Sequence, residues 1–77
     1  MTYNYTIIFE SEDKGGYHVF CPTLQGCHSY GKTIEAARKN MKEAIEAYIE
    51  SMKKDGEPIP IEKDMLVGEL KLELASA

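Results

Sequence analysis

The 77-residue sequence contains no tryptophan, two cysteines, three prolines and a single arginine. No apolar run approaches the roughly 18 residues that a membrane-spanning helix needs. The first residues lack the basic and apolar stretches of a secretory signal. With 13 acidic residues against 9 basic ones the net charge is −4, so few cations are available to displace counterions from nucleic-acid phosphates. We therefore expect a cytoplasmic protein without a direct nucleic-acid or membrane partner, whose charge suits a basic protein.

The short length limits how the chain is organised. A second hydrophobic core does not fit, so a single domain is predicted over residues 1–77. Cores of this size rarely contribute more than roughly 3–5 kcal/mol of stability, and self-association buries additional apolar surface. A homodimer or higher oligomer is therefore expected.

Three short strands are predicted in the first half of the chain. Apolar and polar residues alternate over residues 3–10, which is typical of a half-buried strand. Paired glycines at 15–16 suit a hairpin turn, and the aromatic and β-branched residues 17–21 predict a second, antiparallel strand. Residues 27–31 form a third candidate strand after a Pro/Gly bend. Together these segments predict a three-stranded antiparallel meander.

A long amphipathic helix is predicted after Thr33, whose side chain suits the N-cap position. Gly56 stands where glycine commonly ends a helix, and Pro58 and Pro60 cannot continue one. The predicted apolar face consists of Ile34, Ala37, Met41, Ala44, Ile45, Tyr48 and Met52, spaced at helical intervals.

Residues 65–74 alternate again with a period of two, so we expect a fourth strand there. The predicted fold class is therefore α+β, in the order β-β-β-α-β, with one sheet and one helix on one face. Ile8, with Phe20 or Tyr30, is expected on the uncovered face, where a partner would cover it. The Leu-Lys-Leu-Glu-Leu segment (70–74) is also suited to pairing at a sheet edge with its copy in another subunit.

Cys21 and Cys27 flank the bend near His18 and His28, which raises four interpretations. A structural zinc site normally has closely spaced Cys or His pairs, and that spacing is absent. A disulfide is disfavoured in a reducing compartment. A cysteine nucleophile needs a base within reach, whereas Cys27 and His28 are consecutive and point apart on a strand. The favoured interpretation is two small buried apolar side chains.

The remaining polar residues do not form a recognisable catalytic pattern. The acidic residues lie in a loop and along the exposed face of the predicted helix, and the glycine pair lacks the strand-loop-helix context of a phosphate-binding loop. No catalytic, metal-binding or cofactor-binding residue is predicted, and we expect the protein to be no enzyme.

The motifs together resemble the HicB-like antitoxin family. The resemblance rests on GGYHVFCPTLQGC (15–27), YGKTIEAA (30–37), EAIEAYIE (43–50) and EPIP (57–60). It covers the chain from about Tyr5 to Pro60 and departs from the family pattern at Gln25, Lys32 and Ala36. The positions that match the family's structural motif are Gly16, Pro22, Gly26, Cys27, Gly31, Thr33, Pro58 and Pro60.

The resemblance implies a partial ribonuclease H-like fold without nuclease acids, and a partner that is a small basic ribonuclease toxin of the HicA type. Many family members carry a C-terminal DNA-binding module, but only 17 residues follow Pro60, so none is expected here. The toxin would be blocked by surface occlusion. The candidate contact residues are Leu24, Gln25 and Tyr30 near the bend and Glu10, Glu12 and Asp13 near the hairpin.

Two other functions remain open. The same fold would serve an oligomeric adaptor or scaffold domain without a toxin. A neighbouring gene for a small basic protein would favour the antitoxin, and the lack of such a gene would favour the adaptor. The fold would also accommodate a degenerate ribonuclease H-like nuclease, which metal analysis and an RNA-degradation assay would detect.

Overall fold

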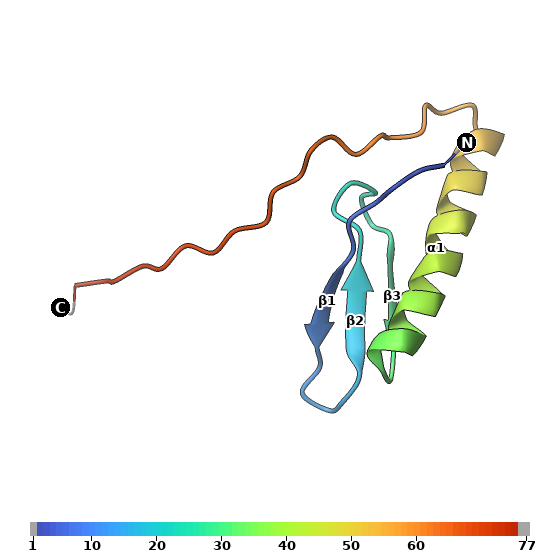
Figure 1. Ribbon diagram of the computed structural model, residues 1–77. Helices are drawn as coiled ribbons and strands as arrows, with labels where there is room; N and C mark the ends of the chain where they lie inside the picture. Colours follow the sequence, from blue (N-terminus) through green and yellow to red (C-terminus); the bar gives the residue numbers. More distant parts are fainter. Residues whose placement is uncertain (1, 76–77) are drawn as a thin grey trace.

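The computed structural model describes residues 2–75 and contains three strands followed by one helix (Figure 1). The elements are β1 (Ile8–Ser11), β2 (Tyr17–Phe20), β3 (His28–Gly31) and α1 (Ile34–Lys54). The sheet has the order β1-β2-β3, and both pairings are antiparallel. The predicted α+β class, with a meander and a long helix on one face of a single sheet, is confirmed.

The first strand is shorter than the predicted range of 3–10. Ile8 pairs with Phe20, the last residue of β2. Beyond Phe20 the chain bends, and Pro22 has no N–H with which to extend the ladder. Residues before Ile8 therefore have no β2 partner, although their side chains keep the alternation of a strand.

Tight turns connect the strands. Gly15 and Gly16 adopt φ values of 98° and 85°, in the left-handed region that favours glycine. In the β2–β3 bend, Cys21 N donates to Cys27 O at 3.1 Å, and Leu24 bonds back to both ends of the bend through its backbone. The bend therefore holds its two cysteines side by side and turns Leu24 inward.

Helix α1 has defined caps at both ends. The Thr33 hydroxyl accepts a hydrogen bond from Ala36 N at 3.0 Å, as an N-cap does. At the other end Gly56 N donates to Lys53 O and Glu57 N donates to Met52 O, at 3.1 and 2.9 Å. This pair of bonds is the Schellman arrangement, and Gly56 supplies its positive φ of 70°.

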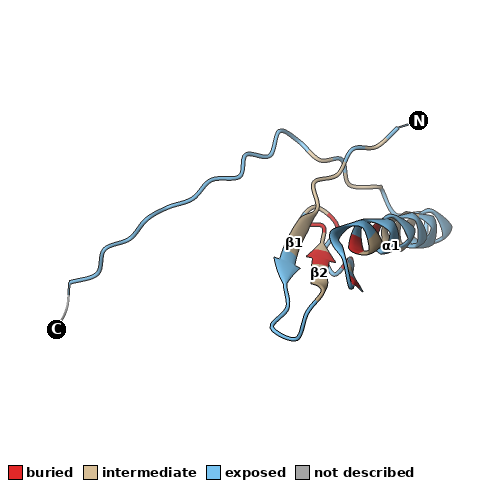
Figure 2. Ribbon diagram, turned by 60° about the horizontal axis from the view of Figure 1, so that its bottom comes forward, coloured by how far each residue is buried: buried red, intermediate tan, exposed pale blue. Residues whose placement is uncertain are grey.

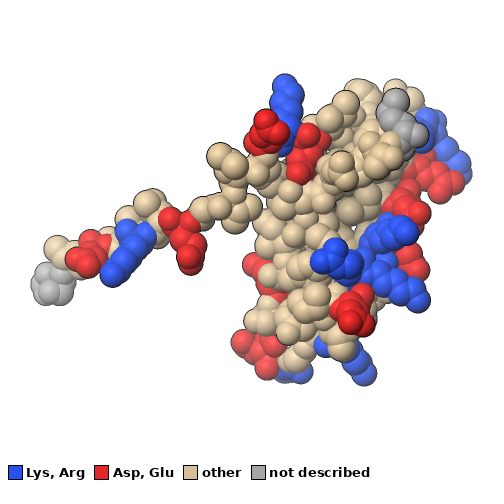
Figure 3. All heavy atoms as spheres, in the orientation of Figure 1, with Lys and Arg blue, Asp and Glu red and all other residues tan. Residues whose placement is uncertain are grey.

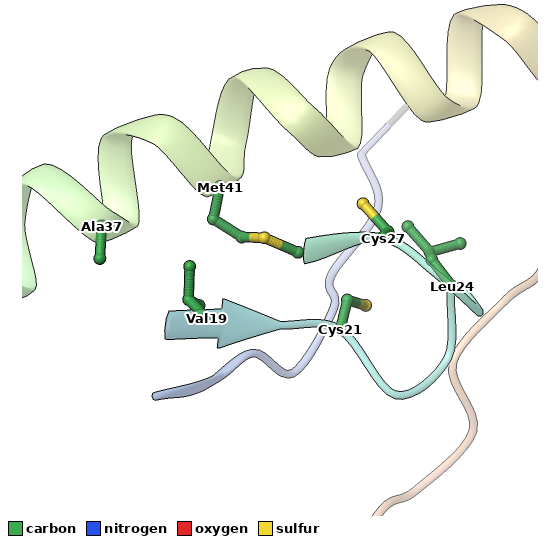
Figure 4. Close-up of a cluster of buried hydrophobic side chains, with 6 residues drawn as sticks. All are labelled: Val19, Cys21, Leu24, Cys27, Ala37 and Met41. Atoms are coloured by element: carbon green, nitrogen blue, oxygen red, sulfur yellow. The ribbon is translucent and has the colours of Figure 1, made fainter. Parts of the chain in front are cut away.

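The core lies between α1 and the β2–β3 half of the sheet (Figures 2 and 4). Gly31 marks the closest approach of the sheet to the helix, because a Cβ atom there would collide with the backbone of Ala36 and Ala37. In the described part of the chain, the buried apolar side chains are Val19, Cys21, Leu24, Cys27, Ala37 and Met41.

The predicted fourth strand is not formed in this single chain. Residues 57–75 form no strand, and 65–74 run outward from the domain in an extended, exposed conformation (Figures 1 and 2). A strand is stabilised by pairing with a neighbour, and this segment has none within residues 2–75. The predicted domain also included residues 1 and 76–77, which lie outside the described part of the chain.

Candidate protein-binding face

The sheet has one face that α1 does not cover, and we call it the outer face. Val19 is fully buried toward α1, so the alternation of side chains directs His18 and Phe20 to the opposite side. Residues paired across the strands point to the same side of the sheet, so the partners of His18 and Phe20 on β1 and β3 share this face. The outer face consists of Ile8, Glu10, His18, Phe20, His28 and Tyr30, which includes the three residues predicted for the uncovered side.

A row of polar side chains crosses the middle of the outer face. His18 Nδ1 lies 3.3 Å from Glu10 Oε1, and His18 Nε2 lies 3.3 Å from His28 Nδ1. In the tautomers that satisfy both contacts, Nδ1–H of His18 donates to Glu10 and Nδ1–H of His28 donates to His18. The His18 ring also stacks on Phe20. The row therefore joins all three strands into one partly exposed surface.

The hairpin end of the outer face is acidic. The Tyr30 hydroxyl donates to Gly15 O at 2.9 Å, which holds the ring against the β1–β2 turn. Tyr30 lines a shallow hollow with Glu12, Asp13 and Lys14, so acidic groups outnumber the basic one there, and its side chain is 46% exposed. Figure 3 shows acidic side chains together with basic ones at this end of the molecule. Tyr30 and two of the predicted acidic contacts are thus close neighbours.

The other end of the outer face is formed by the β2–β3 bend. A hollow of about 460 Å³ is lined there by residues including Phe20, Pro22, Gln25 and His28. Gln25 is exposed, and its carbonyl accepts a hydrogen bond of 2.9 Å from the Tyr48 hydroxyl of α1. The helix therefore holds the bend in place and leaves the Gln25 side chain accessible.

The predicted contact set requires one correction. Leu24 is fully buried among the core residues, so its side chain is unavailable to a partner. A leucine in a Pro/Gly bend resembles an exposed loop tip in the sequence, but the bend folds inward. The other five candidates lie on the outer face or at its two ends: Glu10, Glu12, Asp13, Gln25 and Tyr30.

Two histidines, which the sequence suggested only as metal ligands or as a catalytic base, also lie on this face. His18 and His28 occupy the centre of the outer face, between the two groups of predicted contacts. Strand alternation places both histidines on the face opposite the buried Val19, so the sequence pattern of β2 and β3 already indicates their position. Among residues 2–75, no group of three or more His, Cys, Asp or Glu side chains is arranged to hold a metal ion.

The motif residues that the resemblance identified occupy turns, caps and the core. Gly26 has φ 80° in the bend, and a Cβ atom on Gly16 would collide with the Tyr30 ring. Cys27 is buried, and burial together with neighbouring Cys21 raises the pKa of its thiol. The two cysteines are free thiols.

The segment after α1 is fastened to the start of the chain, which the sequence did not indicate. Pro60 O accepts a hydrogen bond of 2.6 Å from the Tyr5 hydroxyl, and Pro58 precedes it in the same extended stretch. Glu62 accepts bonds from Thr6 N and Thr6 Oγ1, both at 2.6 Å, and from Thr23 Oγ1 at 3.2 Å. The side-chain and backbone bonds from Thr6 lower the pKa of Glu62.

Comparison with known proteins identifies the class to which this fold and face belong. A family model described as "HicB_like antitoxin of bacterial toxin-antitoxin system" matches residues 5–73. A UPF0150 protein of Synechocystis sp. is 53% identical over 70 residues, which cover 91% of this chain and 87% of the relative. A UPF0150 protein of Thermoplasma acidophilum is 52% identical over 56 residues, covering 73% and 81%. The chain therefore belongs to the HicB-like antitoxin family.

The helix is not of the kind that crosses a bilayer. Within residues 2–75, α1 has 21 residues, but no stretch of it is apolar enough to span a membrane.

Proposed function

We propose that this chain is an antitoxin that binds and blocks a small basic ribonuclease toxin of the HicA type. It would act by covering the toxin surface, without catalysing a reaction itself. The proposal extends the family assignment, which concerns antitoxins of toxin–antitoxin systems in general. It includes action in the cytoplasm, assembly as a homodimer or higher oligomer, and a partial ribonuclease H-like fold without direct DNA contact.

The observation that carries the proposal is the outer face and its acidic end. A protein-binding surface combines an apolar centre with a charged rim, and here Ile8 and Phe20 lie beside the histidines while Glu12 and Asp13 lie at the edge. Complementary charge steers association with a basic protein and accelerates the encounter. The net charge of −4 has the sign that such a partner requires.

The first test searches the reading frames next to this gene for a small basic protein and co-expresses that protein with this chain. We expect the two proteins to co-purify and expression of this chain to restore growth that the neighbour suppresses. Failure to bind any such neighbour would refute the antitoxin assignment and favour an adaptor domain. Ribonuclease activity in this chain alone would refute the non-catalytic role.

A matched pair of variants tests the binding face. Glu12→Lys with Asp13→Lys reverses the charge of the hairpin end, whereas Glu43→Lys with Glu50→Lys makes the same net change on the exposed side of α1. We expect the hairpin variant to weaken toxin binding by at least about tenfold and the helix variant to change it little. Equal losses in both variants would show that net charge matters and the outer face does not.

A further inference from the structure

The C-terminal arm, residues 65–74, exposes an unusual amount of apolar surface. Its leucines point to one side of an extended chain, because they occupy alternate positions. A contiguous exposed apolar surface of this kind marks an interaction site. The four leucines are Leu66, Leu70, Leu72 and Leu74, with exposed fractions from 72% to 94%.

Strand β1 leaves one edge of the sheet without a partner. Cys21 N donates to Cys27 O, so the backbone groups of Cys21 and Val19 face β3. Those of His18 and Phe20 then face β1, where their partners are Glu10 and Ile8. By alternation, the backbone N–H and C=O groups of Ile7, Phe9 and Ser11 point outward. Within residues 2–75 no strand pairs with this edge.

The opposite edge of the sheet is protected. The Tyr30 carbonyl of β3 accepts a hydrogen bond of 2.7 Å from Asn40 Nδ2 of α1. Helix α1 packs mainly against β3 and β2, so its side chains lie over this part of the sheet. The β1 edge is therefore the available place for an added strand.

A partly apolar groove accompanies the free β1 edge on its helix-facing side. Because α1 lies over β3 and β2, it leaves a groove of about 390 Å³ beside the start of β1. Its lining combines apolar side chains with polar ones, the apolar set including Tyr5, Ile7, Met41 and Ile45 and the polar set being Asn4, Arg38, Lys42 and Glu46. A strand added at the edge directs alternate side chains into this groove and the others to the outer face. The arm has this pattern, since its leucines alternate with residues that include Glu69, Lys71 and Glu73.

The arm does not cover the edge of its own sheet. Its root is fixed by the bonds from Thr6 and Thr23 to Glu62, and beyond that point the chain leaves the domain in both views (Figures 1 and 2). Charges of both signs line the arm as it extends (Figure 3). Ten extended residues span about 33 Å, which is ample for a four-residue strand such as β1. A second copy offers an identical free edge and an identical groove.

We infer that the C-terminal arm of one copy adds as a fourth strand to the β1 edge of a second copy, with its leucines in that copy's groove. The exchange is reciprocal, so two chains satisfy both edges and both arms. This inference specifies how the oligomer of the proposed function assembles. The experiments below use this chain without a toxin. Their results therefore test the arm exchange independently of toxin binding.

The first experiment compares the full chain with a chain that ends at Lys63. Both retain Glu62, and circular dichroism checks that the shortened chain keeps its helix and strands. We expect sedimentation and light scattering to give a dimer or a multiple of it for the full chain and a monomer for the shortened one. A shortened chain that still dimerises, or a full chain that stays monomeric at high concentration, would overturn the inference.

Point variants separate the two sides of the arm at equal net charge. Leu70→Lys with Leu72→Lys and the control Glu69→Gln with Glu73→Gln each raise the charge by two. We expect the leucine variant to weaken dimerisation by at least about 100-fold, because the apolar side no longer fits the groove. The control should stay within about threefold of the original chain, as rim charges contribute little. Equal effects of the two variants would contradict the inference.

Hydrogen exchange distinguishes the second copy from other occupants of the edge. Arm exchange protects the amides of Ile7, Phe9 and Ser11 only at concentrations where the dimer is present. Protection in a monomer would mean that the arm folds back onto its own β1. A monomer whose β1 amides are unprotected would mean that the arm binds a different protein. Either result would overturn the inference.

Discussion

Both carboxylate oxygens of Glu62 accept hydrogen bonds from one residue, Thr6. The backbone N–H of Thr6 donates to Oε1 and its hydroxyl donates to Oε2, each at 2.6 Å. These bonds favour the ionised carboxylate, which is why the pKa of Glu62 lies below its ordinary value. The contact links residues 56 positions apart and fixes where the C-terminal segment leaves the domain.

This contact predicts a dependence of stability on pH. Because the folded-state pKa of Glu62 is lowered, its contribution to stability is present above the ordinary carboxyl pKa of 4.5 and is lost as the pH falls through the lowered value. Glu62→Gln should lower the thermal midpoint at neutral pH and reduce the loss of stability on acidification. Thermal unfolding between about pH 3 and pH 7 measures both effects.

The matched control is Glu43→Gln, on the exposed side of α1. This variant removes the same charge and should retain the original pH profile. If both glutamine variants behaved alike, the hydrogen bonds from Thr6 would not be the source of the acid sensitivity.

A second prediction concerns the close approach of the sheet to the helix. Gly31→Ala should destabilise the domain by about 3 kcal/mol, because the added methyl group collides with the backbone of Ala36 and Ala37. Gly68→Ala is the control, since its added Cβ atom meets no other group within 4 Å. Urea denaturation measures both variants, and a Gly31 variant as stable as the control would contradict the close packing.

A third prediction separates the two neighbouring residues of the β2–β3 bend. Leu24→Ala should cost about 2–5 kcal/mol, because it leaves a cavity in the core. Gln25→Ala should leave stability within about 0.5 kcal/mol, because its side chain is exposed. Chemical denaturation gives both values. A stable Leu24 variant with impaired partner binding would restore Leu24 as a contact residue and remove it from the core.

A fourth prediction concerns thiol reactivity. Cys21 and Cys27 are 2% and 5% exposed, and burial raises the pKa of Cys27, so little reactive thiolate is present in the folded chain. We expect a disulfide reagent to modify both thiols at least about 100-fold more slowly in the native protein than in urea. Ser51→Cys, on an exposed helix position, should add one thiol that reacts at once. Rapid native reaction of the original thiols would contradict their burial.

The strands, turns and helix were largely predictable because their signals are local. Thr33 and Gly56 delimit α1 as helix caps do, and the glycine pair at 15–16 marks the first hairpin. The fourth strand was predicted wrongly for a single chain. Alternation shows that residues 65–74 suit a sheet, but it contains no information about which edge is free to accept them.

The candidate site was predictable only in part. Five of the six proposed contacts lie on or beside the outer face, because turn residues and alternate strand residues are exposed for local reasons. Leu24 was misplaced because the inward direction of the bend depends on the backbone bonds between Leu24, Cys21 and Cys27. The meeting of His18 with His28 likewise depends on the register of β2 against β3.

The sequence by itself determined the order of the elements, the limits of the helix, the acidic balance and the resemblance to HicB-like antitoxins. These properties follow from composition and from periodicities of two and 3.6 residues, which act over short distances along the chain. The tertiary structure alone decided that Leu24 is a core residue, that Glu62 fastens the C-terminal segment to Thr6, and that no strand within residues 2–75 covers the outer edge of β1. Each of these features depends on which distant segments of the chain meet. Close packing and hydrogen bonds between those segments form only when the chain has folded.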